Sequence, residues 1–259
     1  LVSLGARQTM GSLDITAGVN VDGDPDASDV KIFMKDIGSG RVNPVERFAA
    51  FPTYLYLNAS ICGALLRPPE AQDNLTGQAY AAKDLGTSYP VARGAGGAHN
   101  EGIEQSGNML IMYAHARISD DGLLARHYGL IKRWADYLVN NTLTPPADQQ
   151  SADGEPAMNL TNLALKGIIA VKAMAEISRA LKHDSDAQAY DNHATDLMTR
   201  WLSLAVSADD THVLGQYNDQ VSRSLLYNLY ADRLGTNIVP ESVVNNQTQF
   251  YSTLAPSVR

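Results

Sequence analysis

Residues 99–110, "HNEGIEQSGNML", place two carboxylates, Glu101 and Glu104, and several amides at the start of a segment that soon becomes apolar. At helical spacing, Glu104, Asn108, Ile111 and His115 share one face. The helix dipole favours a carboxylate in a first turn, so one interpretation of Glu104 is a cap or a first-turn charge. The other is an acid/base group, or a carboxylate that binds a substrate amine, beside the amide of Asn108. We therefore take Glu104 as a catalytic candidate and Asn108 as a substrate-binding candidate.

A second carboxylate precedes this segment. In "KDLGTSYP", Asp84 is followed by Leu-Gly and Tyr89 stands before a proline. This pattern is also typical of a simple turn. With Glu104, Asp84 would form the carboxylate pair that acid/base chemistry uses, but sequence spacing does not show that the two converge. The hypothesis makes Asp84 catalytic and Tyr89 substrate-binding.

Two lysines complete the set of candidates. Asn162 and Lys166 lie one helical turn apart in "TNLALKG", among apolar neighbours. Lys166 could extend toward solvent, or its ammonium could face inward and hold a substrate carboxylate or a partner aspartate. Lys35 and Asp36, in "KDIGSG", read as an exposed turn after a short strand, or as a further pair of substrate-binding groups.

Several catalytic motifs are absent from the sequence. It has no Gly-x-Ser-x-Gly elbow, no Walker A loop, no His-Glu-x-x-His and no cysteine cluster, and its 6 histidines are scattered. The sequence therefore predicts neither a metal site nor a cofactor.

Composition narrows the class of protein. The chain has 259 residues, 44% of them hydrophobic, and a net charge of −8, with no run of Lys or Arg. This length and hydrophobic content predict a single globular domain over residues 1–259. The negative charge disfavours nucleic acid and anionic membrane surfaces as partners.

The elements that position these side chains are helices, which we predict from the periodicity of apolar residues. It predicts helices at about 52–67, 102–118, 121–141, 159–181, 184–206, 221–234 and 240–253. Only residues 29–37 could form a strand, and long polar connectors lie at 67–102 and 144–157. Serial helices joined by long loops favour an all-α fold, an α/α toroid with its loops at one end around a cavity. Residues 1–28 would be a lead-in and 29–259 the toroid, which could be incomplete.

Glycosylation acceptor patterns indicate the compartment. Five Asn-x-Ser/Thr sequences occur, of which Asn74 and Asn140 lie in polar stretches that suit a glycan. They favour a secreted protein, extracellular or associated with the cell wall. The single cysteine, Cys62, lies in an apolar run and is expected to be a small buried residue.

Six segments in order resemble the fungal glutaminase A family: "FMKDIGSG", "DLGTSYP", "EQSGNMLIM", "HYGLIKRWADYLV", "TNLALKGIIAVKAMAEI" and "LLYNLYADRLGTNIVP". The resemblance covers nearly the whole chain from about residue 29. It implies an extracellular amidohydrolase that converts L-glutamine to L-glutamate and ammonia, with a helical domain similar to six-hairpin glycosidases. It also implies a longer parent chain, whose N- and C-terminal segments would be partners of this region.

Two other functions stay open from the sequence. The same toroid with two loop carboxylates could serve a glycoside hydrolase. Alternatively, the chain could be a non-catalytic secreted helical fragment. The glutaminase-like hypothesis assigns acid/base or electrostatic roles to Glu104 and Asp84, and substrate contacts to the other polar candidates.

Overall fold

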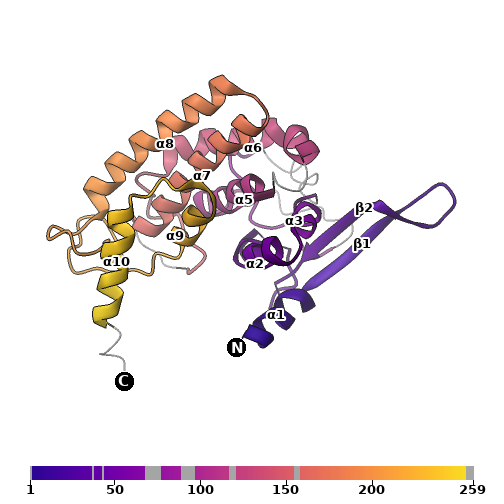
Figure 1. The fold of residues 1–259 in the computed structure, drawn as a ribbon, viewed down its shortest axis with the longest axis horizontal. Coiled ribbons are helices and arrows are strands. Elements are labelled where there is room, and N and C mark those ends of the chain that lie inside the picture. The colour runs from indigo at the N-terminus through magenta and orange to yellow at the C-terminus, as the bar shows by residue number, and fades with distance from the viewer. Residues whose placement is uncertain are drawn as a thin grey trace.

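The computed structural model describes residues 2–36, 38–42, 44–67, 77–88, 97–116, 121–154 and 158–254. It is mainly helical, with one small sheet (Figure 1). The elements are α1 Val2–Gly11, β1 Leu13–Val19, β2 Pro25–Met34, α2 Pro44–Leu57, α3 Ala59–Leu66, α5 Gly102–Ala116, α6 Asp121–Asn141, α7 Thr161–Ala180, α8 Asp184–Ala205, α9 Asn228–Ala231, the π-helical turn η1 Asp232–Thr236, and α10 Glu241–Leu254.

Helix α7 forms the centre of the molecule. Most of its 20 residues are buried, because apolar side chains cover almost its whole circumference. It packs against α5, α6 and α8, which gather around it in one helical body (Figure 1). Gly167 permits a close approach at one end of α7: a Cβ there would lie 1.7 Å from Oγ1 of Thr142. Four of its polar residues are therefore held inside the core: Thr161, Asn162, Lys166 and Ser178.

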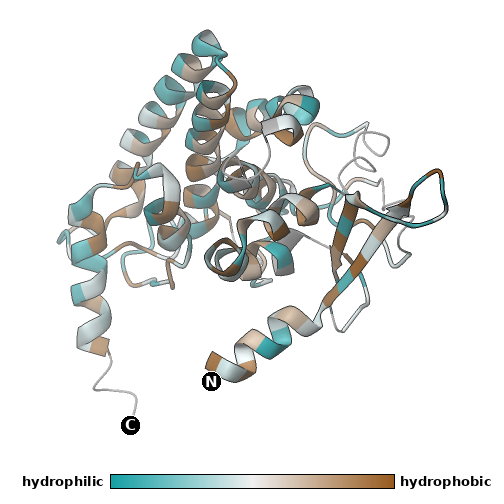
Figure 2. Ribbon diagram, turned by 45° about the vertical axis from the view of Figure 1, so that its right-hand side comes forward, coloured by the Kyte–Doolittle hydropathy of each residue, from teal (hydrophilic) through white to brown (hydrophobic). Residues whose placement is uncertain are grey.

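Helices α6 and α8 follow the sequence prediction closely. On α8 the buried side chains form the single stripe that spacing indicated, while hydrophilic residues follow its other side (Figure 2). The buried set is Ala187, Tyr190, Ala194, Leu197, Met198, Trp201 and Ala205. The amphipathic interpretation of both helices is confirmed.

The N-terminal part contains a hairpin that the sequence did not predict. Strands β1 and β2 pair antiparallel and extend away from the helices (Figure 1). The Asn20 side chain organises the turn between them, because its Oδ1 accepts the N–H groups of Asp22 at 3.0 Å and Asp24 at 2.9 Å. Only the end of β2 is buried. Residues 1–28, expected to be a lead-in, therefore include α1, β1 and the first residues of β2.

Two further boundaries differ from expectation. The helix predicted at 52–67 is two helices that meet at Asn58, whose backbone is extended (φ −163, ψ 104) and whose side chain accepts the Ser60 N–H. This side-chain cap starts a new helix, which apolar periodicity alone does not show. The helix predicted at 221–234 is also wrong over 221–227. There the Ser222 hydroxyl accepts the N–H of Gly215 at 3.1 Å and ties the segment to a loop instead.

The mainly helical fold is confirmed, and the β1–β2 hairpin lies outside the all-α description. Closure of the helices into a complete α/α toroid stays a prediction. Within the described ranges, no helix is both long and apolar enough to cross a membrane.

Candidate functional site

Glu104 and Asn108 lie on the inward face of α5, one turn apart and both buried. Asn108 Nδ2 donates to Glu104 Oε1 at 3.1 Å. Glu104 stands in the first turn of α5, where the helix dipole favours a negative charge. Sequence spacing predicted this shared face correctly.

Lys166 reaches the same two residues from α7. Its Nζ donates to Glu104 Oε1 in a very short ion pair and to Asn108 Oδ1 at 2.8 Å. The Lys166 and Glu104 side chains are each only 1% exposed. Each of the three side chains therefore contacts the other two. Of the two interpretations of Lys166, the structure shows the one in which the ammonium faces inward, with Glu104 rather than an aspartate as its acidic partner.

The second oxygen of Glu104 differs from the first. Oε1 accepts hydrogen bonds from both Asn108 and Lys166, whereas buried Oε2 has no hydrogen-bond partner among the residues that the structure describes. Leaving a buried acceptor unsatisfied costs about 1–3 kcal/mol. Such an atom is a candidate contact for a ligand that brings its own donor.

Aromatic rings enclose the Lys166 ammonium. Nζ lies 4.7 Å from the ring centroid of Phe48 on α2 and 5.4 Å from that of Tyr227, just before α9. Both distances fall within the range of cation–π attraction. The ammonium is thus stabilised by one carboxylate oxygen, one amide oxygen and two ring faces.

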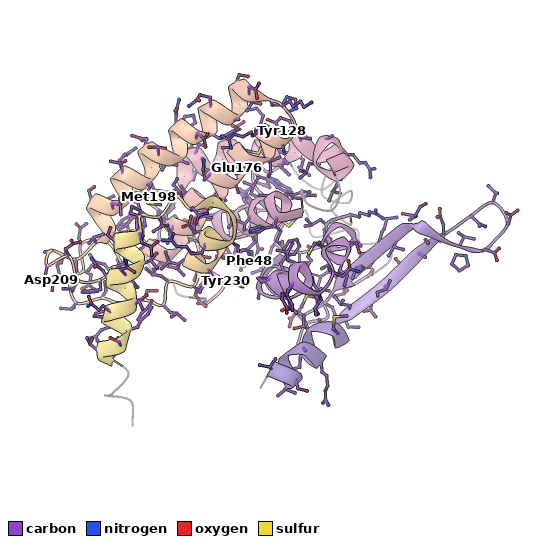
Figure 3. The ribbon with its side chains drawn as sticks, in the orientation of Figure 1. Phe48, Tyr128, Glu176, Met198, Asp209 and Tyr230 are labelled. Carbon is purple, nitrogen blue, oxygen red and sulfur yellow. The ribbon has the colours of Figure 1, made fainter. Side chains whose placement is uncertain are left out.

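A cavity of about 550 Å³ opens beside this cluster. Figure 3 shows Phe48 and Tyr230 on facing elements, α2 and α9, and both line it. Its lining is mostly apolar: Phe48, Ala49, Phe51, Pro52, Leu55, Ile111, Met112, Ala152, Tyr227, Tyr230, Ala231 and Leu234, with Glu104, His115, Asp153 and Lys166 as polar members. This size and composition are typical of a small-molecule site.

His115 lines the cavity about three turns along α5 from Glu104. The turn η1 packs against it: a Cβ on Gly235 would lie 2.8 Å from the His115 ring. Sequence spacing placed His115 on the Glu104 face but gave no reason to choose it as a site residue. His115 contacts η1, which lies 120 residues further along the chain, and the sequence does not show a contact between such distant segments.

Asn162 lies one turn before Lys166 on α7, but its side chain is engaged elsewhere. Asn228 Nδ2 donates to the Asn162 carbonyl oxygen and to its Oδ1, both at 3.0 Å. Asn162 is not among the cavity-lining residues. It therefore fixes α9, and with it the aromatic side of the cavity, against α7.

Asp84 is not brought to the cavity. Its Oδ1 accepts from Arg41 Nη1 at 3.0 Å and from the Gly86 N–H at 2.7 Å. The adjacent backbone pairs with Val42, whose N–H donates to the Gly86 carbonyl at 3.1 Å. These contacts match the turn interpretation, and a catalytic pair of Asp84 with Glu104 stays a hypothesis.

The remaining candidates are dispersed. Lys35 pairs with Asp14 at 2.7 Å, and Asp36 closes its own loop, where the hydrogen bond from the Ser39 hydroxyl lowers the pKa of this carboxyl. Asn140 is exposed near the end of α6. Tyr89 and Asn74 lie outside the described residues. Among those described, no group of three or more His, Cys, Asp or Glu side chains could hold a metal.

One missed residue supports the start of α5. His99 Nδ1 accepts the Glu101 N–H at 3.1 Å, and Nε2 lies 2.9 Å from the Ala81 carbonyl. Burial lowers the pKa of this imidazole. Glu101 in turn pairs with Lys83 at 2.5 Å and accepts from Gln105 at 2.7 Å. Glu101, ahead of α5, thus belongs to one hydrogen-bond network, and Glu104, within α5, belongs to a separate one.

The chain is similar to known proteins over most of its length. A family model described as "Glutaminase A six helical-hairpin domain" matches residues 1–257. The chain is 40% identical over 268 residues to "Glutaminase A" of Aspergillus oryzae, covering 98% of this chain and 37% of that protein. It is 26% identical over 300 residues to a "Probable glutaminase" of Arthroderma benhamiae, covering 90% of this chain and 34% of that one. The chain thus spans about a third of the length of these relatives.

Proposed function

Because the chain belongs to the family of the glutaminase A six helical-hairpin domain, we propose that it takes part in glutaminase-type amide hydrolysis at the cavity beside Glu104. The observation that carries this proposal is the state of the Glu104 carboxylate. Glu104 lines the cavity. One of its oxygens is fixed by Lys166 and Asn108, and the other is buried without a hydrogen-bond partner among the described residues.

The proposed reaction converts L-glutamine and water to L-glutamate and ammonia. A water molecule adds to the side-chain amide carbon while Glu104 Oε2 accepts its proton. The C–N bond then breaks, and the same oxygen returns the proton to the leaving nitrogen. Lys166 neutralises the carboxylate at its other oxygen, and the Asn108 amide fixes its orientation. No net proton remains on the protein after the cycle.

The environment of Glu104 suits this role. Its side chain is 1% exposed, and the rings of Phe48 and Tyr227 flank the ammonium that pairs with it. A bound amide would meet the carboxylate with little bulk water present, and electrostatic interactions are stronger in such surroundings. The same oxygen could instead bind the α-ammonium group of the substrate, as the sequence also allowed.

Ammonia release from L-glutamine by the purified chain tests the proposal, with Glu104→Gln alongside. The substitution keeps the size of the side chain but removes the base, and we expect turnover to fall about 10²-fold or more. The matched control is Glu241→Gln, because Glu241 also stands in a helix first turn but is exposed and pairs only with Arg233 among described residues. Release from the folded wild-type chain that is equal in Glu104→Gln would overturn the role of Glu104. No release at all would count against activity of this chain.

We further propose that the protein is secreted and carries a glycan at Asn140. Asn140 is exposed, and its acceptor sequence ends at Thr142. Expression in a secreting host, followed by glycosidase treatment and mass measurement of wild type and Asn140→Gln, tests this.

A further inference from the structure

The charges around the cavity restrict the substrate. Its charged lining residues are Glu104, Asp153 and Lys166, and the Lys166 ammonium is already paired with Glu104 and Asn108. Among the described residues, a free α-carboxylate bound beside this cluster would have no cation of its own. Burying an unpaired charge is strongly unfavourable. The cluster therefore suits the amide and ammonium groups of glutamine better than its α-carboxylate.

His115 is not positioned to serve that carboxylate. It lies on the same helix face as Glu104 but about 16 Å away along the axis of α5. The α-carboxyl carbon of glutamine lies four C–C bonds from its side-chain amide carbon, about 5 Å at full extension. A glutamine held at Glu104 therefore cannot place its own α-carboxylate at His115.

The space between these two ends is apolar. Ile111 and Met112 on α5, Leu55 on α2 and Leu234 on η1 line the cavity there or at its rim. Leu234 is 42% exposed and Tyr230, which also lines the cavity, is 58% exposed, so both side chains reach solvent. Free glutamine has only its two methylene groups to cover these side chains, whereas burying more apolar surface strengthens binding.

From these observations we infer that the preferred substrate is a glutamine whose α-carboxyl group is joined in an amide bond to an apolar residue, that is, the N-terminal glutamine of a peptide. Masking the carboxylate removes the unpaired charge, and the apolar neighbour fills the lining beyond Glu104. This inference rests on the proposed function, since it assigns the substrate class of the same site.

Calorimetric titration compares L-glutamine with L-glutaminyl-L-leucinamide, a probe with no carboxylate. We expect the probe to bind at least about tenfold more tightly, because it buries a leucine side chain without an unpaired charge. Tyr230→Ala and Leu234→Ala should each weaken binding of the probe severalfold, and by more than they weaken binding of L-glutamine. The matched control is Leu225→Ala, because Leu225 is exposed on the same segment but does not line the cavity.

The inference is overturned if the probe binds no more tightly than L-glutamine. It is also overturned if Leu225→Ala weakens binding of the probe as much as Tyr230→Ala and Leu234→Ala do. Ammonia release is measured separately with both compounds. The rate without protein is subtracted and the product identified as the glutamyl peptide, because N-terminal glutamine also cyclises spontaneously. Release from L-glutamine without tighter probe binding would retain the proposed function and reject this inference. Tight probe binding without release from either compound would reject the proposed function and with it the assignment of a substrate, leaving a cavity that binds such peptides without turnover.

Discussion

Gly107 on α5 lies against the stem of Lys166 on α7, so closely that a Cβ on Gly107 would approach Lys166 Cγ to 2.8 Å. The far end of Lys166 is fixed by Glu104 and Asn108, so its stem cannot simply move aside. The absence of a side chain at one position therefore allows the buried ion pair to form.

Gly107→Ala should consequently destabilise the fold, although alanine is the better helix former. We expect a loss of about 1–3 kcal/mol in the free energy of unfolding, from overpacking. The measurement is urea denaturation. Gly129→Ala is the matched control, because Gly129 lies inside α6 with nothing within 4 Å of a new Cβ, and it should be neutral or stabilising by up to about 1 kcal/mol. Equal behaviour of the two variants would contradict the packing argument.

Lys166→Met should be more damaging. It leaves the Glu104 carboxylate buried without its cation, which typically costs about 3–5 kcal/mol. Adding Glu104→Gln should recover a large part of that loss, because the remaining group is then neutral. A double-mutant cycle by chemical denaturation measures the coupling. If the losses in free energy of unfolding caused by Lys166→Met and Glu104→Gln simply add in the double variant, the broken ion pair is not the reason for the instability.

His99 should make stability depend on pH. Burial lowers the pKa of its imidazole in the folded protein, whereas an unfolded histidine titrates near 6.5. Below about pH 6.5 the unfolded chain therefore binds more protons, and the free energy of unfolding falls as pH falls toward the folded pKa. Above that pH the contribution is complete.

Urea denaturation of wild type and His99→Gln between pH 7.5 and pH 5 tests this. The difference between their free energies of unfolding should shrink as pH falls, since only wild type loses the contribution of a neutral imidazole. A difference that stays constant, or grows, would show that His99 does not titrate in this way.

Cys62 should be inert to thiol reagents in the folded state. It is fully buried, and burial raises the pKa of its thiol to about 12. Thiolate is the reactive form, so a disulfide reagent at neutral pH should label Cys62 only as fast as the protein opens. Labelling followed by absorbance, with and without denaturant, makes the comparison. Rapid stoichiometric labelling of the native chain would show that the thiol is accessible.

The sequence predicted the regular helices well, because strong apolar periodicity is a local signal. Helix α6 matches its expected bounds of 121–141, and Glu104, Asn108 and Lys166 were each chosen from helical spacing. Their meeting was not predictable, since Lys166 and Glu104 are 62 positions apart and nothing local reports the packing of α5 on α7.

Two errors in the predicted elements also have physical causes. Strand β1 was missed although "LDITAGV" alternates apolar and polar residues, a pattern typical of a strand. Its apolar side is not buried, since Ile15 is 65% exposed. The segment 221–227 was assigned to a helix because its apolar residues suit one. The hydroxyl of Ser222 instead satisfies loop N–H groups of Gly215 and Gln216, which periodicity does not register.

Because α7 supplies both the central core surface and Lys166, folding and site assembly are one cooperative event. The ion pair cannot form before α5 and α7 dock, and these helices cannot separate without breaking it. Substitutions that tune the chemistry from α7 will therefore also change how much of the chain is folded. During evolution, new activities at this cavity should arise more readily from α2, α9 and η1, which line it from outside that central interface.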